Sequence, residues 1–269
     1  MSLRTRHAVD PHVVVAEVVA TRRVSPSMVR VTFGGEGIGL FTATGADQWF
    51  RLFLPREGQD VLRLPTRTSA LWYVQYLATP RHLRPWIRAY TVRAARPEQA
   101  EIDVDFVVHL HDGQPTGPAV RFALEAQPGD RVGILDQGVT FTPHHDGSVL
   151  LVADETGLPA VAGICASLPS GARGLALVEV PSAADVQPVA APPGVEVRWL
   201  TRDQDGDVPG RLALRELCTA TLPTGPVRAY AVGEQALATG ARRHLVGERG
   251  LHKKQVTFAG YWRHGHAAQ

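Results

Sequence analysis

The sequence predicts two domains, an antiparallel β-barrel followed by an α/β domain built on a parallel sheet. The chain has 269 residues, which is longer than a single domain of common size. Up to residue 143, short segments rich in β-branched residues are separated by turn signals, the pattern of a barrel. From residue 144, apolar runs alternate with helical patterns, the pattern of parallel strands joined by helices. We therefore expect domains over 1–143 and 144–269.

Each expected element has a local reason. In the first domain, alternating segments bounded by Pro, Gly and Ser predict strands, and apolar residues at helical spacing predict helices. In the second domain, continuous apolar runs predict strands that helices cover on both faces. Strands are expected over 13–24, 28–33, 48–54, 88–93, 101–109, 131–135, 148–153, 174–180, 195–200, 227–232 and 255–258. Helices are expected over 71–77, 119–126, 158–168, 212–222 and 234–246.

Charge and cysteine content argue against several classes of protein. The formal net charge is +2, which gives no electrostatic reason to expect a nucleic-acid partner. Cys165 and Cys218 are far apart and lack the spacing of a metal or iron–sulfur site, so no metal ligands are expected. The sequence shows no signal-peptide segment and no apolar run long enough to span a bilayer. We expect a cytoplasmic protein with no membrane partner.

The segment Arg88-Ala89-Tyr90-Thr91-Val92-Arg93 combines two guanidinium groups, a ring and a hydroxyl on one expected strand. It resembles the Arg-x-Tyr-Thr flavin signature of ferredoxin-reductase-like flavoproteins. A guanidinium matches phosphate oxygens two at a time, a ring offers flat apolar surface to an isoalloxazine, and a hydroxyl can hydrogen-bond a ring nitrogen. Strand alternation predicts Arg88, Tyr90 and Val92 on one face, with Thr91 and Arg93 on the other. The alternative is a core strand with two solvated arginines.

With its second arginine, the motif is similar to that of the siderophore-interacting protein family, whose members reduce ferric siderophores. The resemblance runs from Val13 to Gly265, with its motifs in family order. It implies an FAD-binding barrel followed by a nicotinamide-binding α/β domain, a ferredoxin reductase-like architecture. It also implies flavin contacts from a strand-end histidine and a Gly-Pro-Ala turn. The implied FAD contacts are Arg88, Ala89, Tyr90, Thr91, Val92, Arg93, His109 (with His111 in reserve), Gly117, Pro118 and Ala119.

Two departures from the family pattern lie in this region. The loop between His109 and Gly117 is longer than expected, and Val120 and Phe122 stand where the family has Ser and Trp. Loss of the hydroxyl removes a phosphate contact. A strand-end histidine is also compatible with an ordinary solvent-facing residue.

The stretch Asp154-Glu155-Thr156-Gly157 follows an apolar run and opens an expected helix. Open α/β sheets bind ligands outside the carboxyl ends of their strands, and a glycine lets the backbone approach a pyrophosphate at a helix N-terminus. The stretch resembles the Asp-Glu-Thr-Ala/Gly-Leu-Pro-Ala segment of siderophore-interacting proteins. These four residues are expected to contact a nicotinamide cofactor, and the alternative is an ordinary helix cap.

Glu179 lies near the end of the following strand, roughly 20 residues after the turn, where doubly wound folds place an acid on the adenosine ribose. A carboxylate there would favour NADH, because it repels a 2′-phosphate. Arg202 follows the third strand and would instead favour NADPH. Both cofactors therefore remain open, as does the reading of Glu179 as an exposed strand-end acid.

The C-terminal Gly260-Tyr261-Trp262-Arg263-His264-Gly265 resembles the family's Gly-Tyr-Trp-Arg-x-Gly ending. Tyr261 and Trp262 are expected near the isoalloxazine or in a domain interface. Ferric siderophores are usually anionic, and a basic cleft would attract them. The expected substrate-binding set is Arg242, Arg243, Lys253, Lys254 and Arg263, although the two adjacent arginines also fit a solvated helix face.

These observations predict an FAD-containing, NAD(P)H-dependent ferric-siderophore reductase that acts as a monomer or dimer. Hydride would pass from nicotinamide to flavin and single electrons to iron(III), with no catalytic acid–base residue required. One alternative is a flavoenzyme of the same fold with another small-molecule acceptor, such as a flavin reductase or a biosynthetic enzyme. The other is a protein that binds an iron chelate without turnover.

Overall fold

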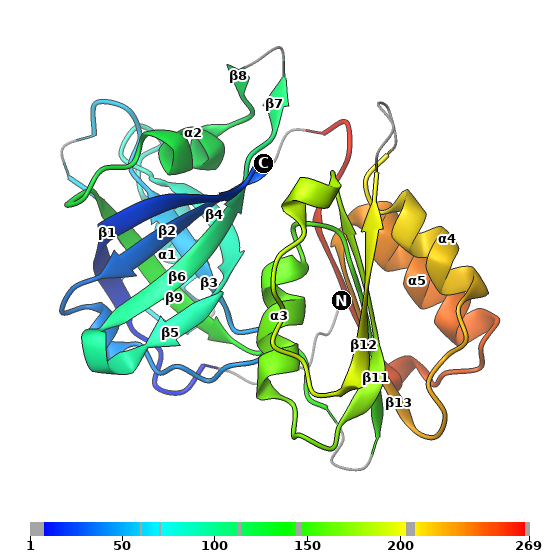
Figure 1. The fold of residues 1–269 in the computed structure, drawn as a ribbon. Coiled ribbons are helices and arrows are strands. Elements are labelled where there is room, and N and C mark those ends of the chain that lie inside the picture. Colours follow the sequence, from blue (N-terminus) through cyan, green and yellow to red (C-terminus); the bar gives the residue numbers. More distant parts are fainter. Residues whose placement is uncertain are drawn as a thin grey trace. The chain divides into compact units, whose positions relative to one another are not determined.

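The computed structural model describes residues 8–59, 61–69, 71–111, 114–143, 147–202 and 208–266. The chain divides into two compact units (Figure 1). The barrel unit comprises Met28–Val139 and the preceding chain up to Val24. The sheet unit comprises the chain from Thr140 onward together with the turn Ser25–Ser27.

The barrel unit is built on a seven-stranded antiparallel sheet with two helices and a small hairpin. The strands of the sheet are β1 (Val13–Ser25), β2 (Met28–Gly34), β3 (Trp49–Leu54), β4 (Trp86–Thr91), β5 (Ala94–Arg96), β6 (Glu101–Val107) and β9 (Arg131–Gly138). The hairpin is formed by β7 (Leu110–His111) and β8 (Gln114–Pro115), and the helices are α1 (Leu71–Ala78) and α2 (Pro118–Glu125).

The sheet closes on itself where the chain passes from β4 to β5. The strand order is β4-β3-β9-β1-β2-β6-β5, so β4 and β5 stand at opposite ends of the order although only two residues separate them. The amide of Val92 donates to the carbonyl of Gln48, whereas the amide of Arg93 donates to the carbonyl of Asp103. Two adjacent residues therefore bond to segments near opposite ends of the strand order, one just before β3 and one in β6. This connection gives the unit its barrel form.

Alternation along β2 shows how sequence builds the barrel core. Val29, Val31 and Phe33 are buried, and Phe33 is in ring contact with Phe106 of β6 and Phe122 of α2. The intervening residues pair across the outer face with acids of β6. For example, Arg30 forms a bidentate ion pair with Asp105, with N–O distances of 2.6 and 2.9 Å. Opposite charges in register reinforce the pairing that the apolar face favours.

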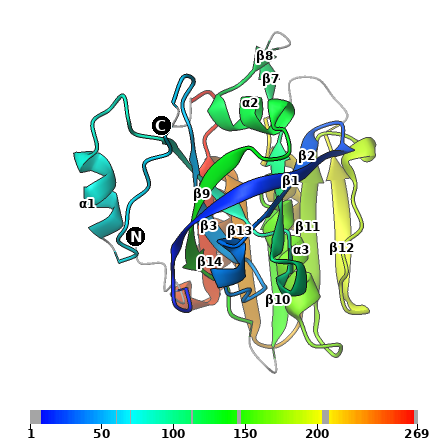
Figure 2. The same ribbon diagram turned by 90° about the vertical axis from the view of Figure 1, so that its left-hand side faces the viewer.

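Helix α1 lies in the long connection between β3 and β4, on the outer side of the barrel unit (Figure 2). Trp72 and Tyr76 hold it there, with ring centroids 6.0 and 6.4 Å from that of Phe53 on β3. None of its residues is buried.

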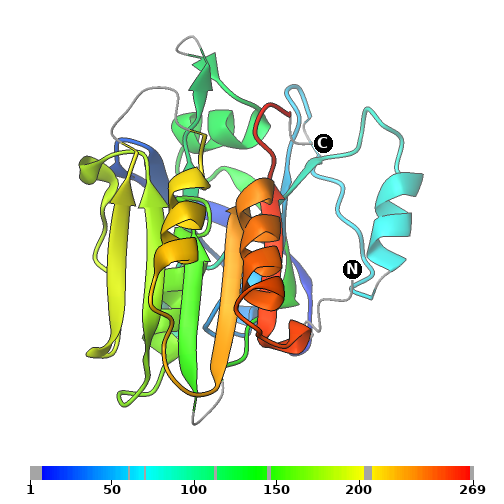
Figure 3. The ribbon, with the colours of Figure 1, turned by 90° about the vertical axis from the view of Figure 1, so that its right-hand side faces the viewer.

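The sheet unit carries five parallel strands, β10 (Ser148–Ala153), β11 (Arg173–Val180), β12 (Gly194–Thr201), β13 (Val227–Glu234) and β14 (Val256–Trp262). Its helices are α3 (Leu158–Ser167), α4 (Arg211–Thr219) and α5 (Gln235–Gly247). Helices α4 and α5 cover one face and α3 the other (Figure 3). The order β12-β11-β10-β13-β14 reverses between β10 and β13, the switch point beside which open sheets bind ligands.

The connection from β11 to β12 contains only a 3-10 turn, Ala183–Asp185. Asp185 is buried and accepts hydrogen bonds from the Ser25 and Ser27 hydroxyls, both at 2.7 Å, and from the Ser27 amide at 2.9 Å. This carboxylate explains why the short turn Ser25–Ser27 belongs to the sheet unit.

The predicted fold class is confirmed: an antiparallel barrel-like sheet and a parallel five-stranded sheet. Five expected strand ends are wrong by two residues or more. The strands expected over 131–135 and 227–232 continue to Gly138 and Glu234. The strand expected over 88–93 ends at Thr91, that over 101–109 ends at Val107, and that over 255–258 continues to Trp262. In each case the pairing partner in another part of the chain decides the boundary. No helix among the described residues is long and apolar enough to cross a membrane.

We expect Phe33→Ala to destabilise the barrel unit by about 3–5 kcal/mol, because it removes a fully buried ring and leaves a cavity. Leu40→Ala is the matched control: this side chain is exposed, and its loss should change the free energy of unfolding by less than about 0.5 kcal/mol. Urea unfolding followed by far-UV circular dichroism measures both. Equal effects of the two substitutions would contradict the assignment of the core.

Candidate functional site

The predicted flavin motif lies on β4, a strand at one end of the sheet order. Arg88 is half-buried, donates to the carbonyl of Ile87 at 2.7 Å, and has its pKa lowered by burial. The Tyr90 ring is half-buried against Phe106, with centroids 4.3 Å apart, and burial raises the pKa of its phenol. Ala89 between them is exposed. The strand therefore fixes a ring and a guanidinium two residues apart.

The predicted alternation is wrong beyond Thr91, because the chain leaves the strand there and crosses to the other edge. Thr91 and Val92 are both buried, each with 7% exposure. The Nε of Arg93 lies 3.6 Å from Oδ2 of Asp105, whose carboxylate also pairs with Arg30. Arg93 thus joins Arg30 in pairing with an acid of β6.

Two residues of β3 that the sequence did not single out lie beside this motif. Arg51 is in register with Ala89, and its Cζ lies 4.8 Å from the Trp49 ring and 5.9 Å from the Trp72 ring. Burial lowers its pKa. In the described part of the chain, neither Nε of Arg51 nor Nε1 of Trp49 has a hydrogen-bond acceptor, although both atoms are buried. A lone arginine within an apolar strand was the signal available in the sequence.

Buried donors without acceptors are rare in folded proteins and indicate a missing partner. Two of them on one face, one belonging to a cation, fit an anionic ligand that carries several acceptor oxygens or nitrogens. Arg51 and Trp49 share the sheet face of Ala89 and Thr91, opposite to Arg88 and Tyr90. A flavin dinucleotide that lies along β4 and meets both faces is such a ligand. The residues of the barrel unit therefore fit FAD.

The second predicted flavin region lies around α2. The carbonyl of His109 accepts from the amide and the hydroxyl of Thr116, at 3.1 and 2.9 Å, and the intervening residues form the β7–β8 hairpin. The added loop length therefore folds locally. His111 lies in β7, and its side chain is outside the described part.

Helix α2 begins with Gly117 in a left-handed conformation, φ 102°, followed by Pro118 at the first helical position. Ala119 and Val120 are buried and Phe122 packs on the barrel core, so the departures from the family pattern at positions 120 and 122 add apolar packing. No side chain caps the first turn of α2, which leaves its amides available to a phosphate.

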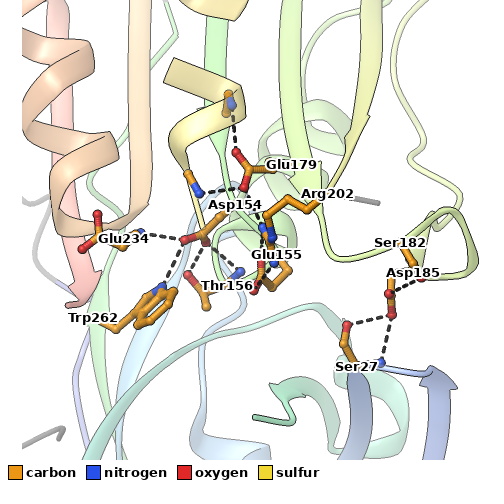
Figure 4. A network of polar contacts seen from close by, with 12 residues as sticks. Ser27, Asp154, Glu155, Thr156, Glu179, Ser182, Asp185, Arg202, Glu234 and Trp262 are labelled. Atoms are coloured by element: carbon orange, nitrogen blue, oxygen red, sulfur yellow. Dashed lines mark hydrogen bonds and ion pairs between the residues drawn. The ribbon is translucent and has the colours of Figure 1, made fainter. Parts of the chain in front are cut away.

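In the sheet unit, Asp154 is fully buried and collects four donors at the carboxyl ends of three strands (Figure 4). Oδ1 accepts from the amide and the hydroxyl of Thr156, at 2.9 and 2.5 Å. Oδ2 accepts from the Glu234 amide at 2.6 Å and from the Trp262 indole at 3.0 Å. Burial and the neighbouring Glu155 charge raise the pKa of Asp154 to about 6, against the effect of these hydrogen bonds.

One glycine makes room for this carboxylate, and a second allows close packing of the turn beside it. A Cβ on Gly233, which has φ 122°, would lie 2.5 Å from Cγ of Asp154. A Cβ on Gly157 would lie 2.6 Å from Cγ2 of Val232 and 2.8 Å from Cβ of Ala153. The structure thus gives Gly157 a packing reason, where the sequence suggested close approach of a pyrophosphate.

Glu179 and Arg202 are both committed to internal contacts (Figure 4). Oε1 of Glu179 accepts from Arg202 at 2.7 Å and the Gly210 amide at 2.7 Å, and Oε2 accepts from the Ala213 amide at 2.8 Å. Arg202 also forms two 2.9 Å bonds with Glu155. Burial alone would lower the pKa of Arg202, and the two carboxylates outweigh it and raise it.

Glu179, at the end of strand β11, therefore caps the N-terminus of helix α4. Its geometry does not fit the predicted ribose contact. Arg202, with only 8% of its side chain exposed, does not fit a contact to a 2′-phosphate. Sequence spacing placed both residues correctly at the carboxyl ends of the strands but did not reveal that they bind each other.

The C-terminal aromatics belong to the same edge. Tyr261 is exposed, and its hydroxyl lies 2.9 Å from that of Tyr230, while Trp262 is held by Asp154. Arg263 follows at the carboxyl end of β14, is exposed, and its side chain has no partner in the described part of the chain.

The predicted substrate-binding cations do not form one cluster. Lys253 and Lys254 precede β14, whereas Arg263 follows it, so a strand of seven residues separates them. At about 3.3 Å per residue, that distance is roughly 20 Å. Arg242 lies on α5 over the Phe258 ring, at 4.8 Å, and Arg243 is exposed on the same helix. Of the set, only Arg263 lies at the carboxyl ends of the parallel strands.

Comparison with protein families covers nearly the whole chain. Residues 17–141 match the siderophore-interacting FAD-binding domain, and residues 147–265 match the siderophore-interacting protein domain. The chain belongs to the siderophore-interacting protein family. The family assignment made from the Arg-x-Tyr-Thr-x-Arg motif is thus confirmed.

Similar proteins include structures and reductases of this family. A siderophore utilization protein from T. fusca superposes with a TM-score of 0.82 at 36% identity, over 97% of each chain. Ferric vibriobactin reductase ViuB of Vibrio cholerae is 29% identical over 93% of this chain and 89% of its own. The NADPH-dependent ferric-chelate reductase of Escherichia coli is 28% identical over 91% of each. Ferredoxin reductase of carbazole 1,9a-dioxygenase shares the fold, with a TM-score of 0.65 at 16% identity.

We expect Arg202→Ala in this family member to lower the free energy of unfolding by about 3–5 kcal/mol, because it leaves two buried carboxylates without their cation. Arg198→Ala is the matched control. Arg198 also pairs with two acids, Glu196 and Glu216, but on the surface, where a loss below about 1 kcal/mol is expected. Chemical denaturation measures both, and similar losses would contradict the role of Arg202 as a buried counterion.

The raised pKa of Asp154 gives a second expectation. Between an unfolded value of about 3.9 and the folded value of about 6, the folded chain holds a proton that the unfolded chain has released. The stabilisation is therefore complete below about pH 4 and is lost as the pH rises through 6, at up to about 1.4 kcal/mol per pH unit. The difference in unfolding free energy between the parent and Asp154→Asn, measured from pH 4 to 7, should show this slope. A constant difference would contradict it.

Proposed function

We propose that the protein is an FAD-dependent reductase that transfers electrons from NADH or NADPH to iron(III) in a siderophore. The observation that carries the proposal is the placement of Arg88 and Tyr90 on an end strand of the sheet in a matched FAD-binding domain. On the neighbouring strand, and on the opposite face of the sheet, Arg51 Nε and Trp49 Nε1 are buried donors without acceptors in the described chain. Two relatives are named reductases of ferric vibriobactin and ferric chelates, which supports the choice of acceptor.

Each barrel residue has a distinct part in the proposal. Arg88, with its charge partly desolvated, would bind the dinucleotide phosphates, assisted by the uncapped first turn of α2. Tyr90, fixed against Phe106, would provide the flat surface under the isoalloxazine. Arg51 and Trp49 would donate to the flavin or to the anionic acceptor next to it. When bound, FAD supplies the conversion of a two-electron hydride into single electrons for iron.

The sheet unit would receive the nicotinamide nucleotide at the carboxyl ends of its strands. Arg202 and Glu179 are occupied by each other, so Arg263 is the cation we assign to the nucleotide phosphates at this edge. Reduction lowers the charge of the metal, and iron(II) binds hard oxygen ligands more weakly than iron(III) does. Electron transfer thereby releases the iron without any acid–base residue.

Anaerobic stopped-flow spectroscopy tests the proposal. Flavin reduction by NADH and by NADPH is followed first, and a ferric siderophore is then added to the reduced protein. We expect flavin reoxidation to accelerate in proportion to chelate concentration, with formation of iron(II) detected by ferrozine. Reoxidation that chelate does not accelerate would favour another acceptor, and a colourless protein that takes up no FAD would favour a binding protein without turnover.

We expect Arg88→Ala combined with Tyr90→Ala to reduce FAD occupancy at least tenfold, because a charged hydrogen bond and a stacking surface are lost together, each on the order of 1–3 kcal/mol. Arg67→Ala is the matched control, since the side chain of this arginine is exposed and forms no ion pair in the described chain. The ratio of visible flavin absorbance to protein absorbance after gel filtration measures occupancy. Undiminished FAD occupancy in the double variant would contradict the assignment of FAD binding to this strand.

A further inference from the structure

Helix α1 and the chain leading to it present an apolar surface to solvent. Each of five side chains here, all large and hydrophobic, is between 47% and 64% exposed. They are Val61, Leu71, Tyr73, Val74 and Leu77. Five of the eleven exposed large hydrophobic residues in the described chain thus lie within seventeen consecutive positions.

The exposed residues share one side of α1. At 100° per residue, Leu71, Tyr73, Val74 and Leu77 lie within roughly half of the helix circumference. Trp72 and Tyr76 lie on the opposite side and pack on Phe53 of the barrel. The helix is therefore anchored by its aromatic side and displays its mainly aliphatic side. Figures 2 and 3 show the helix itself on the outside of the barrel unit.

The connection that carries α1 is well tied by hydrogen bonds. Gln75 accepts from the amides of Thr66 and Arg67, at 3.0 and 3.2 Å, and the Tyr76 hydroxyl donates to Pro85 at 2.9 Å. Arg84 donates to the carbonyls of Leu77 and Thr79 at the end of the helix. The polar groups are thus used to fix the loop in a form that leaves its apolar residues uncovered.

Arginine is concentrated in the sequence around this surface, although Glu57 and Asp60 stand just before it and Arg93 and Arg96 pair with acids of β6. From residue 61 to residue 97 the sequence contains seven arginines and no Asp or Glu, although the whole chain has 28 basic and 26 acidic residues. Arg63, Arg67 and Arg81 are exposed beside α1, and in the described chain none of them forms an ion pair.

We propose that the α1 surface, defined as Val61, Leu71, Tyr73, Val74 and Leu77 with Arg63, Arg67 and Arg81, binds an anionic lipid surface. Apolar side chains enter the boundary between headgroups and acyl chains, and arginines bind lipid phosphates. A second copy of this chain fits less well, because a two-fold contact would bring the exposed arginines of one copy close to those of the other. This proposal departs from the sequence-based expectation of no membrane partner, which rested on the lack of a signal peptide and of a spanning segment.

Vesicle co-sedimentation of the full FAD-loaded chain tests the proposal. Vesicles of phosphatidylcholine alone are compared with vesicles that also contain phosphatidylglycerol, at low and high salt. We expect binding to the anionic vesicles, weakened by salt, and little binding to the neutral ones. Val74→Asp combined with Leu77→Asp should weaken it at least tenfold, whereas Val9→Asp combined with Leu40→Asp, at exposed apolar positions elsewhere, should leave it unchanged.

A second variant keeps the test independent of helix integrity. Replacing Arg63, Arg67 and Arg81 by Gln alters only exposed positions, and should weaken anionic-vesicle binding by on the order of fivefold per residue and flatten its salt dependence. Unchanged flavin absorbance and chelate reduction would confirm that each variant is folded. Absence of binding to anionic vesicles, equal binding by parent and variants, or sedimentation velocity showing a dimer dissolved by the aspartates would overturn the proposal.

Discussion

One buried carboxylate, that of Asp154, determines how the carboxyl edge of the parallel sheet is built. An ionisable group without partners in the interior costs several kcal/mol, so it is tolerated only where donors surround it. Thr156 comes from the turn after β10, the Glu234 amide from the end of β13 and the Trp262 indole from the end of β14. The glycine at 233 and the tryptophan near the C-terminus both follow from this one electrostatic requirement.

The polar groups at the two candidate sites are balanced in opposite ways, although Arg228 and His244 elsewhere in the sheet unit also keep a buried nitrogen without a hydrogen-bond partner in the described chain. At the sheet edge, four acids are satisfied by amides, a hydroxyl, an indole and one arginine, all from within the unit. In the barrel unit, Arg51 and Trp49 keep buried donors without acceptors in the described chain. An anionic ligand can accept hydrogen bonds from donors that have no acceptor, whereas carboxylates that already accept hydrogen bonds offer it none. This difference is why our proposal assigns the binding of anions mainly to the barrel and gives the sheet edge a shape-defining part.

The fold could be predicted well from sequence because its signals are local. Periodicity places nearly every strand and helix, and the change of period near residue 143 separates two architectures. The site is harder, since its decisive contacts join distant segments. Nothing near Arg93 in sequence shows that β4 ends two residues earlier, or that Asp105 pairs with the Arg93 guanidinium. Arg51 belongs to no motif, and only the fold reveals that it lies beside Ala89 without an acceptor. Motifs thus identify positions, whereas tertiary contacts determine which groups remain free.

Glu179 shows the physical limit of reasoning from spacing. The rule that an acid roughly 20 residues after the turn binds a ribose assumes that the carboxylate is free. Here its two oxygens accept from Gly210, Ala213 and Arg202, so it acts as the cap that α4 lacks locally. A nucleotide that recruited either Glu179 or Arg202 would break a buried ion pair, at a cost of about 3–5 kcal/mol, whereas one new charged hydrogen bond returns about 1.5–3 kcal/mol. The balance is unfavourable for a 2′-hydroxyl and for a 2′-phosphate alike. Under our proposal, any discrimination between NADH and NADPH would therefore rest on residues other than Glu179 and Arg202, the pair at the positions where this fold usually makes the choice.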